Sequence, residues 1–340
     1  MKAFLDSTDI GHKTDQLKQR LDRDGYLYLS GLLPTEVIES LRLRWLQFAH
    51  DAGWVSGKTP FGSEVADLSA FCAEPQEVYM DVMHQVYKLP EFWNIPLHPN
   101  VIDLFERLFG DQVLTLPNVI GRTIFPQRTE YTTPAHQDWI SIQGCEETYT
   151  CWLPVADVPA ELGGLQLNAG SHRGGIYNFK PAMGAGAMEI VDGLDESKWV
   201  YSPTHQGDVV IFHSLTVHKG MPNSTDRLRM SIDARYQRVS DTVAPNSLKP
   251  HGGLITWEQL YENWPEDHPF KYYWHQWDLE MKDYDMTYVQ KRDDMAFEMA
   301  QAGDRNARGV LERIISRDLN EAKRDRARQL LEKLEGEGGE

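Results

Sequence analysis

Cysteine is scarce in this sequence, whose 340 residues include only Cys72, Cys145 and Cys151. An odd number of cysteines without paired spacing provides neither a disulfide framework nor a zinc ribbon. The three thiols are therefore expected to be reduced, as in a protein of the reducing cytoplasm. Long apolar runs are also missing, and no stretch approaches the ~18 consecutive apolar residues that a membrane-spanning helix needs. The N-terminal segment lacks the apolar core of a secretory signal, so we expect a cytoplasmic protein.

Positively charged residues are too few to balance the acidic ones. The sequence has 34 lysines and arginines against 51 aspartates and glutamates, which gives a formal net charge of −17. Such a surface repels the phosphates of nucleic acids and of anionic lipids. We therefore expect no nucleic acid partner and no membrane partner, and a small molecule as the substrate.

The character of the sequence changes near residue 112. Residues 15–50, including Tyr26 and Tyr28, and residues 74–110 carry apolar side chains at helical spacing. From 112 to about 240, short runs rich in Val, Ile, Thr, Tyr and Trp alternate with Gly, Pro and Asn. Short strands at turn-like spacing favour a β-sandwich or barrel over alternating βαβ units. Strands are predicted at 112–116, 119–124, 147–153, 164–167, 208–212 and 229–237.

Beyond residue 250 the pattern becomes helical again. The stretch 256–290 is dense in aromatic side chains, which indicates packing against the main body. Residues 290–335 are charged and carry apolar residues at helical spacing, which predicts a helical hairpin. We therefore expect a β-rich domain with N-terminal helices over residues 1–250 and a C-terminal helical extension, 251–340, packed on it. The extension is also predicted to offer a surface for a homodimer.

The motif with the clearest chemical meaning is His136-Gln137-Asp138. Residues two apart on a strand project from the same face, so this spacing brings an imidazole and a carboxylate together. They are two of the three groups in the 2-His-1-carboxylate triad that binds non-haem Fe(II). By itself the His-x-Asp spacing is a weak signal, because short motifs occur by chance.

A third ligand has to come from a distant strand that folds back beside the first. His218 ends the apolar run 210–218, and Arg229 follows on the next predicted strand. An arginine there could pair bidentately with a dicarboxylate that lies over a metal. Three protein ligands on one face leave three positions for a 2-oxo acid and O2, which a closed four-ligand site could not provide.

Three blocks of the sequence resemble the phytanoyl-CoA dioxygenase family of 2-oxoglutarate oxygenases. Their order and family-like separations argue against chance agreement, and the resemblance spans roughly residues 20–240. Residues beyond 240 lie outside it. The three blocks are PAHQD (134–138), CWLPVADVPAELGGLQLNAGSHR (151–173) and GDVVIFHSLTVHKGMPNSTDRLRMSIDARY (207–236).

The resemblance implies a mainly β fold with helical flanks, built on a double-stranded β-helix, which is the jelly roll of cupin-like proteins. It also implies Fe(II) as the cofactor, with 2-oxoglutarate and O2 as cosubstrates. Residue by residue, His136, Asp138 and His218 match the iron ligands of the family. Related halogenases carry a small residue in place of the carboxylate. The intact Asp138 therefore favours hydroxylation, desaturation or ring closure over halogenation.

Other site residues are also carried over from the resemblance. Arg229 matches the arginine that binds the distal carboxylate of 2-oxoglutarate, and Arg227, two residues earlier, is the alternative. Trp152 matches an aromatic residue that contacts the cosubstrate in relatives, and Thr150 has the same parity on its strand. Four more side chains are candidates for substrate contact, one as a pocket wall and three as polar anchors: Trp139, Arg122, Gln127 and Arg235.

The predicted function is that of an Fe(II)- and 2-oxoglutarate-dependent dioxygenase. It would hydroxylate, or otherwise oxidise, an unactivated C–H bond of a small metabolite or natural product while 2-oxoglutarate is decarboxylated to succinate and CO2. Two alternatives stay open. One is a catalytically inactive jelly-roll binding protein, and the other is a cupin-type metalloenzyme that does not use 2-oxoglutarate. Arg229 argues against the second alternative, because that chemistry has no dicarboxylate to bind.

Overall fold

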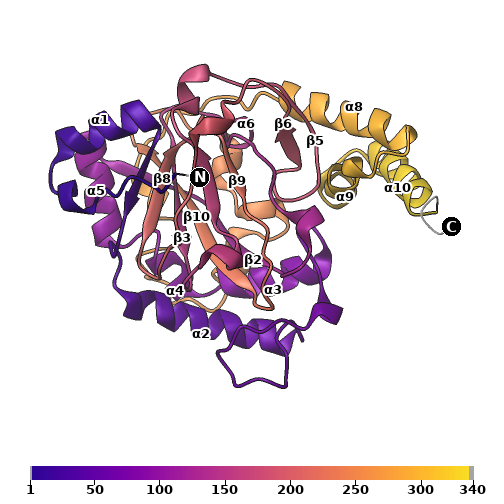
Figure 1. The fold of residues 1–340 in the computed structure, drawn as a ribbon, viewed down its shortest axis with the longest axis horizontal. Helices are drawn as coiled ribbons and strands as arrows, with labels where there is room; N and C mark the ends of the chain where they lie inside the picture. The colour runs from indigo at the N-terminus through magenta and orange to yellow at the C-terminus, as the bar shows by residue number, and fades with distance from the viewer. Residues whose placement is uncertain (1, 337–340) are drawn as a thin grey trace.

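The computed structural model describes residues 2–336 and is built around two antiparallel β-sheets (Figure 1). The larger sheet has the strand order β1-β8-β3-β10-β2, the smaller one has the order β7-β4-β9, and β5 pairs with β6. The larger sheet contains β1 Tyr26–Leu29, β2 Val113–Ile124, β3 Tyr149–Pro154, β8 Val209–His213 and β10 Arg229–Arg238. The other strands are β4 Leu165–Asn168, β5 Phe179–Pro181, β6 Met188–Ile190, β7 Trp199–Val200 and β9 His218–Gly220.

An apolar core fills the space between the two sheets. Trp152 of β3 and Phe212 of β8 lie in the same buried cluster as Leu167 of β4. Ile211, one residue before Phe212, belongs to a different cluster on the other side of the larger sheet. This alternation follows from the pleat of a strand, in which successive side chains project to opposite faces. The larger sheet is therefore buried on both faces.

Helices cover the other face of the larger sheet. Trp45, Met83 and Phe92 approach β2 at Gly121, where an added Cβ would lie 2.8 Å from the Trp45 ring and 2.9 Å from the methyl group of Met83. Glycine allows this approach because it has no Cβ. The helices of this layer are α1 Thr14–Asp24, α2 Thr35–Asp51, α3 Glu77–Tyr87, α4 Pro90–Asn94 and α5 Pro99–Phe109.

The bounds of α5 show how the sequence sets a helix. Pro99 occupies the first turn, where its missing N–H is not needed. Val101, Leu104 and Leu108 recur at helical spacing and are buried. The helix ends before Gly110, whose φ of 67° is a left-handed conformation that glycine adopts without strain.

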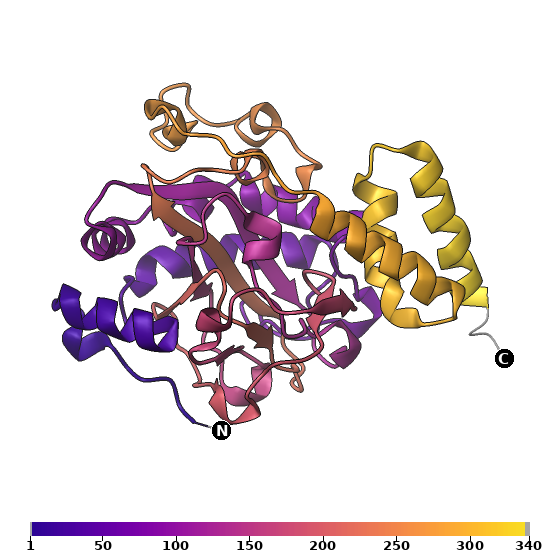
Figure 2. The same cartoon turned by 90° about the horizontal axis from the view of Figure 1, so that it is seen from above.

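The C-terminal part forms a group of three helices beside the two-sheet core (Figure 2). These helices share their own apolar cluster, which includes Phe297 and Ile314. Between residues 254 and 286 the chain is largely irregular and packs through aromatic side chains, with Trp274 against Leu114 and Leu116 of β2. The three helices of the group are α8 Thr287–Gln301, α9 Arg308–Arg317 and α10 Glu321–Gly336, and α8 contacts β5. The short helix α7, Trp257–Leu260, lies within the largely irregular stretch.

The structure differs from the sequence predictions in four places. Helix accounts for 41% of the chain and strand for 19%, so a mainly β fold is not confirmed. Tyr26 and Tyr28, expected in a helical segment, lie in β1, because this strand is buried and pairs with β8. The predicted strands 112–116 and 119–124 are one strand, β2. The hairpin expected over 290–335 is three helices.

Among residues 2–336, no helix combines the length and apolarity needed to cross a bilayer.

Candidate metal centre and adjoining cavities

Backbone pairing brings two histidines from distant segments together. The His136 N–H donates to the His218 carbonyl at 2.9 Å, and the His218 N–H donates to the His136 carbonyl at 3.0 Å. This is an antiparallel bridge, and His218 is also the first residue of β9. The centroids of the two imidazole rings are 4.1 Å apart. The two imidazoles therefore project into the same space.

Asp138 completes the group from a short helix rather than from a strand. It precedes α6, Trp139–Ile142, and its backbone is helical, with φ −68° and ψ −31°. The expected strand geometry of His136 and Asp138 is therefore wrong, although the two side chains still meet. Asp138 Oδ1 is 3.8 Å from His136 Nε2 and 3.7 Å from His218 Nε2. One ligand atom from each residue lies within 4.8 Å of the others, so the three could hold a metal ion.

Hydrogen bonds fix the tautomer of both histidines. His136 Nδ1 is 2.8 Å from the Pro134 carbonyl, and His218 Nδ1 is 3.0 Å from the Thr216 carbonyl. A carbonyl can only accept, so each Nδ1 carries the proton and each Nε2 keeps a free lone pair. Burial, assisted by His218, lowers the pKa of His136 to about 3, so this imidazole is neutral at physiological pH. Two imidazoles that each turn Nε2 toward one carboxylate fit the triad that binds Fe(II).

The second oxygen of Asp138 is held by the protein. Thr150 Oγ1 donates to Asp138 Oδ2 at 2.5 Å, and Arg235 Nη2 donates to the same oxygen at 3.2 Å. Burial opposes ionisation, but Arg235 and the hydrogen bond from Thr150 hold the pKa of Asp138 below its usual range. The carboxylate is therefore ionised and oriented, with Oδ1 left for a metal. Thr150 and Arg235, expected to contact the cosubstrate and the substrate, both hold this carboxylate and also line the small cavity beside it.

We expect Thr150→Val to weaken Fe(II) binding by about 10- to 100-fold, because hydrogen bonds behind metal ligands have effects of this size. The variant keeps the shape of the side chain and removes only the hydroxyl. Anaerobic titration with Fe(II) measures the change. Thr115→Val is the matched control, since the buried Thr115 hydroxyl has no hydrogen-bond partner within residues 2–336. Equal Fe(II) affinities of the two variants would contradict the orienting role of Thr150.

A small cavity of about 40 Å³ adjoins the three residues, and Arg229 lines it. Only 6% of Arg229 is exposed; Nη1 donates to the Gly163 carbonyl at 2.9 Å and Nε has no partner. Within the described part of the chain, no carboxylate forms a salt bridge with this guanidinium. Burial lowers the pKa of Arg229 to about 10, so it is charged at neutral pH. The cavity is lined by Arg122, Thr133, His136, Asp138, Thr150, Trp152, Leu165, Phe212, His218, Gly220, Arg229, Asp233 and Arg235.

A larger cavity of about 490 Å³ opens on the other side of the same centre. His136, Asp138 and Arg235 lie on its wall together with residues of α8 and α9, so it runs between the two-sheet core and the C-terminal helices. Its apolar lining comes from both parts: Leu116, Ile120, Ile142, Met188, Met286, Val289 and Ile314.

The other predicted substrate residues are in varied surroundings. Arg122 lines both cavities, and its Nε donates to Asp233 at 2.8 Å. Trp139 packs edge-on against Tyr288. Gln127 is exposed, and its amide donates to the Thr225 carbonyl at 3.1 Å. Trp139, Gln127 and Arg227 are not among the described residues that line either cavity.

Sequence reasoning missed the contribution of the C-terminal helices to the larger cavity. Arg292 of α8 and Arg313, Ile314 and Arg317 of α9 all line it. The helical periodicity of residues 308–317 predicts a helix but does not show what that helix faces. The resemblance noted above also ends before these residues.

One protein family, two enzymes and one solved structure are similar to this chain. The model of the phytanoyl-CoA dioxygenase (PhyH) family matches residues 21–231. The 1-deoxypentalenic acid 11-beta-hydroxylase of Streptomyces arenae is 29% identical over 264 residues, which cover 73% of this chain and 89% of that protein. The enzyme of the same name from Streptomyces exfoliatus is 28% identical over 268 residues, covering 74% and 90%. Among solved structures, one similar protein is the epimerase SnoN, in complex with Fe3+, alpha ketoglutarate and nogalamycin RO. It is 23% identical to this chain with a TM-score of 0.46, and the match covers 69% of this chain and 87% of the SnoN chain.

Proposed function

This chain belongs to the phytanoyl-CoA dioxygenase family, and on that premise we propose that it hydroxylates an unactivated C–H bond of a small metabolite or natural product. It is a non-haem iron enzyme that depends on 2-oxoglutarate and O2. In the net reaction a C–H bond, 2-oxoglutarate and O2 become an alcohol, succinate and CO2. One oxygen atom of O2 enters the alcohol and the other enters succinate.

The observation that carries the proposal is the buried group of His136, Asp138 and His218 with both Nε2 lone pairs free. These residues would hold Fe(II), which supplies the oxidising power once 2-oxoglutarate and O2 are bound. The protein supplies two imidazoles, an ionised carboxylate and a small buried cavity beside them. In the proposed fold, the two facing antiparallel sheets are the double-stranded β-helix of this family.

Arg229 is the proposed anchor for the far carboxylate of 2-oxoglutarate. It is buried and charged, and it lines the small cavity beside the three metal ligands. A buried guanidinium without a carboxylate partner is unfavourable by itself, and a bound dicarboxylate would neutralise it. Trp152 lines the same cavity, so its ring would cover the cosubstrate and exclude water. An enzyme without 2-oxoglutarate would have no use for this arginine.

A small organic substrate is supported by the larger cavity. Its volume of about 490 Å³ falls in the range of cavities that enclose drug-sized ligands. The two Streptomyces relatives hydroxylate 1-deoxypentalenic acid, which is in keeping with such a substrate. Asp138 is a carboxylate, which favours hydroxylation, desaturation or ring closure over halogenation. A homodimer through the C-terminal helices and a cytoplasmic location stay predictions.

Anaerobic titration of the metal-free protein with Fe(II) and then 2-oxoglutarate tests the proposal. We expect the weak visible charge-transfer band of an iron chelate of the 2-oxo acid, and succinate formation once O2 is admitted. Iron binding without the band would favour a metalloenzyme that does not use 2-oxoglutarate. Absence of both iron binding and the band would favour a catalytically inactive binding protein.

A further inference from the structure

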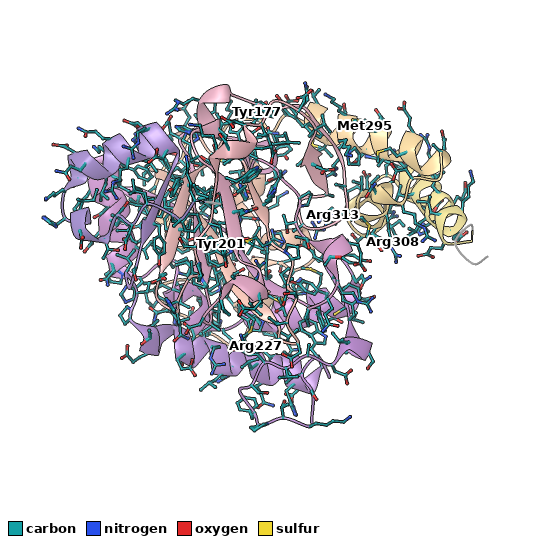
Figure 3. The ribbon with its side chains drawn as sticks, in the orientation of Figure 1. Tyr177, Tyr201, Arg227, Met295, Arg308 and Arg313 are labelled. Atoms are coloured by element: carbon teal, nitrogen blue, oxygen red, sulfur yellow. The ribbon has the colours of Figure 1, made fainter. Side chains whose placement is uncertain are left out.

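The α9 helix presents an unpaired buried cation to the larger cavity. Arg313 is 7% exposed, and its Nη1 donates to the Gly309 carbonyl, one turn earlier in its own helix, at 3.2 Å. Within residues 2–336 it forms no salt bridge. Figure 3 labels Arg313 on the part of α9 next to the two-sheet core, whereas Arg308 lies nearer α10. Burial lowers the pKa of Arg313 to about 10, so it is charged at neutral pH.

The carboxylate of Glu74 on the same cavity wall is already occupied. It lies 2.9 Å from Arg317 Nη2, 3.1 Å from Arg122 Nη1 and 3.2 Å from His251 Nε2. Burial opposes ionisation of Glu74, but His251 and the two arginines keep its pKa well below the usual range. These three contacts involve both of its oxygens. Glu74 attracts Arg313 only at longer range, because no salt bridge joins these two described residues.

The other acidic residues of the wall also have cationic partners. Asp293 lies 2.9 Å from Arg292 and 2.7 Å from Lys323, and Asp318 lies 2.7 Å from the same lysine. Asp138 faces Arg235 and the two histidines of the metal centre. Among the described arginines of this wall, Arg313 is the one that forms no salt bridge with a carboxylate.

A buried charge without a counterion is costly, and proteins retain one mainly where a ligand pairs with it. The chain as a whole is acidic, with a net charge of −17. A surplus of cations in the chain therefore does not explain why Arg313 lies unpaired in this cavity. The lining is mixed: polar and charged side chains are numerous, and its apolar part includes Ile120 and Ile142 from the core and Val289 and Ile314 from the helices. The cavity therefore fits a substrate that has both apolar and polar parts and a negative charge that reaches Arg313.

We propose that Arg313 binds the carboxylate of a partly apolar substrate and so directs its carbon skeleton toward the metal centre. The planar guanidinium matches a carboxylate bidentately. Lys249 also lines the cavity but is exposed to solvent, so Arg313 is the one buried cation of the described wall without a salt bridge, which favours a carboxylate over a phosphate monoester carrying about −1.5 to −2. The inference rests on the proposed function and names the class of its substrate. The selecting residue lies outside the segment 21–231 that defines the family.

The test compares carboxylic acids with their own primary carboxamides, which have nearly the same shape but no charge. Linear and alicyclic acids of eight to fifteen carbons are titrated calorimetrically into the anaerobic protein loaded with Fe(II) and 2-oxoglutarate. In the wild type we expect at least one acid to bind about 10- to 100-fold more tightly than its amide, as charge-assisted hydrogen bonds allow. Arg313→Met should reduce this ratio to about one.

Arg308→Met is the matched control on the same helix, because Arg308 pairs with Glu312 at 2.9 Å and with Glu335 at 3.3 Å and does not line the cavity. This variant should keep the preference for the acid. Melting of the ligand-free proteins gives an independent measurement. Arg313→Met removes an uncompensated buried charge, so its Tm should equal that of the wild type or exceed it by about 1–3 °C. A merely structural arginine would instead lower Tm when replaced.

The outcomes separate this inference from the proposed function. If the wild type forms the 2-oxoglutarate chelate but no acid is preferred over its amide, the substrate assignment is wrong and the enzyme class stands. The same holds if the preference survives Arg313→Met or if that variant melts at a clearly lower temperature. Failure of the wild type to bind 2-oxoglutarate contradicts the proposed function, whatever the acids do.

Discussion

Asp138→Ala is expected to abolish turnover and to weaken Fe(II) binding by more than about 100-fold, beyond the effect of changes behind the ligands. The reason is that Asp138 supplies the single anionic ligand atom of the centre, with Oδ1 3.7–3.8 Å from the two Nε2 atoms. Without it, only the two imidazoles remain to hold a divalent cation. Anaerobic Fe(II) titration and succinate formation measure the two effects.

A second variant distinguishes a folding defect from loss of the metal-binding carboxylate of Asp138. Asp138→Ala leaves Arg235 without a buried carboxylate, which destabilises the fold by itself. Asp138→Asn keeps the size of the side chain and an oxygen to accept from Thr150, and it should also fail to retain iron. Asp103→Ala, an exposed change on α5, should bind iron as the wild type does. Retention of wild-type iron affinity by a folded Asp138→Asn protein would remove Asp138 from the proposed ligand set.

Arg229→Met is expected to raise the KM for 2-oxoglutarate by about 10- to 100-fold, as the loss of a charge-assisted pair implies. Turnover at saturating 2-oxoglutarate should fall much less, because the metal ligands are untouched. Arg229→Lys should recover part of the affinity, since it keeps the charge but not the planar fork. Succinate formation at varied 2-oxoglutarate concentrations measures both constants.

The pH dependence and a neighbouring residue provide checks on Arg229. Its pKa of about 10 means that the guanidinium is charged at neutral pH and loses its proton as the pH rises through 10. The KM for 2-oxoglutarate should therefore be lowest below that pH and increase above it. Arg227→Met is the control, because Arg227 does not line either cavity. A larger rise in KM for Arg227→Met than for Arg229→Met would favour the alternative assignment.

The sequence alone predicted much of the sheet. The strand expected at 229–237 is β10, Arg229–Arg238, and that expected at 208–212 is β8, Val209–His213. Both have β-branched or aromatic residues between turn signals, which is local information. The segment Tyr26–Leu29 was misread, because its character as a strand depends on pairing with β8, far along the chain. Propensity does not contain that long-range pairing.

In the candidate site, too, some features were predicted from local sequence and others depend on contacts between distant segments. The spacing of His136 and Asp138 predicted that their side chains meet, although the backbone that joins them turns from a bridge into α6. Arg313 could not be found from sequence, because an arginine on a charged helix is normally exposed. Its burial arises only when α9 lies against the core, and no local pattern encodes that contact. The substrate-facing wall is therefore the part that required the structure.

The contacts of Glu74 have a consequence for the order in which a newly made chain matures. Synthesis begins at the N-terminus, so the residues of the metal centre emerge before α9, which carries Arg317, and domains of this size generally fold as they emerge. Glu74 can gather Arg122, His251 and Arg317 only after α9 has left the ribosome. The cavity wall that carries Arg313 and Arg317 is therefore completed only after His136, Asp138 and His218 have been synthesised.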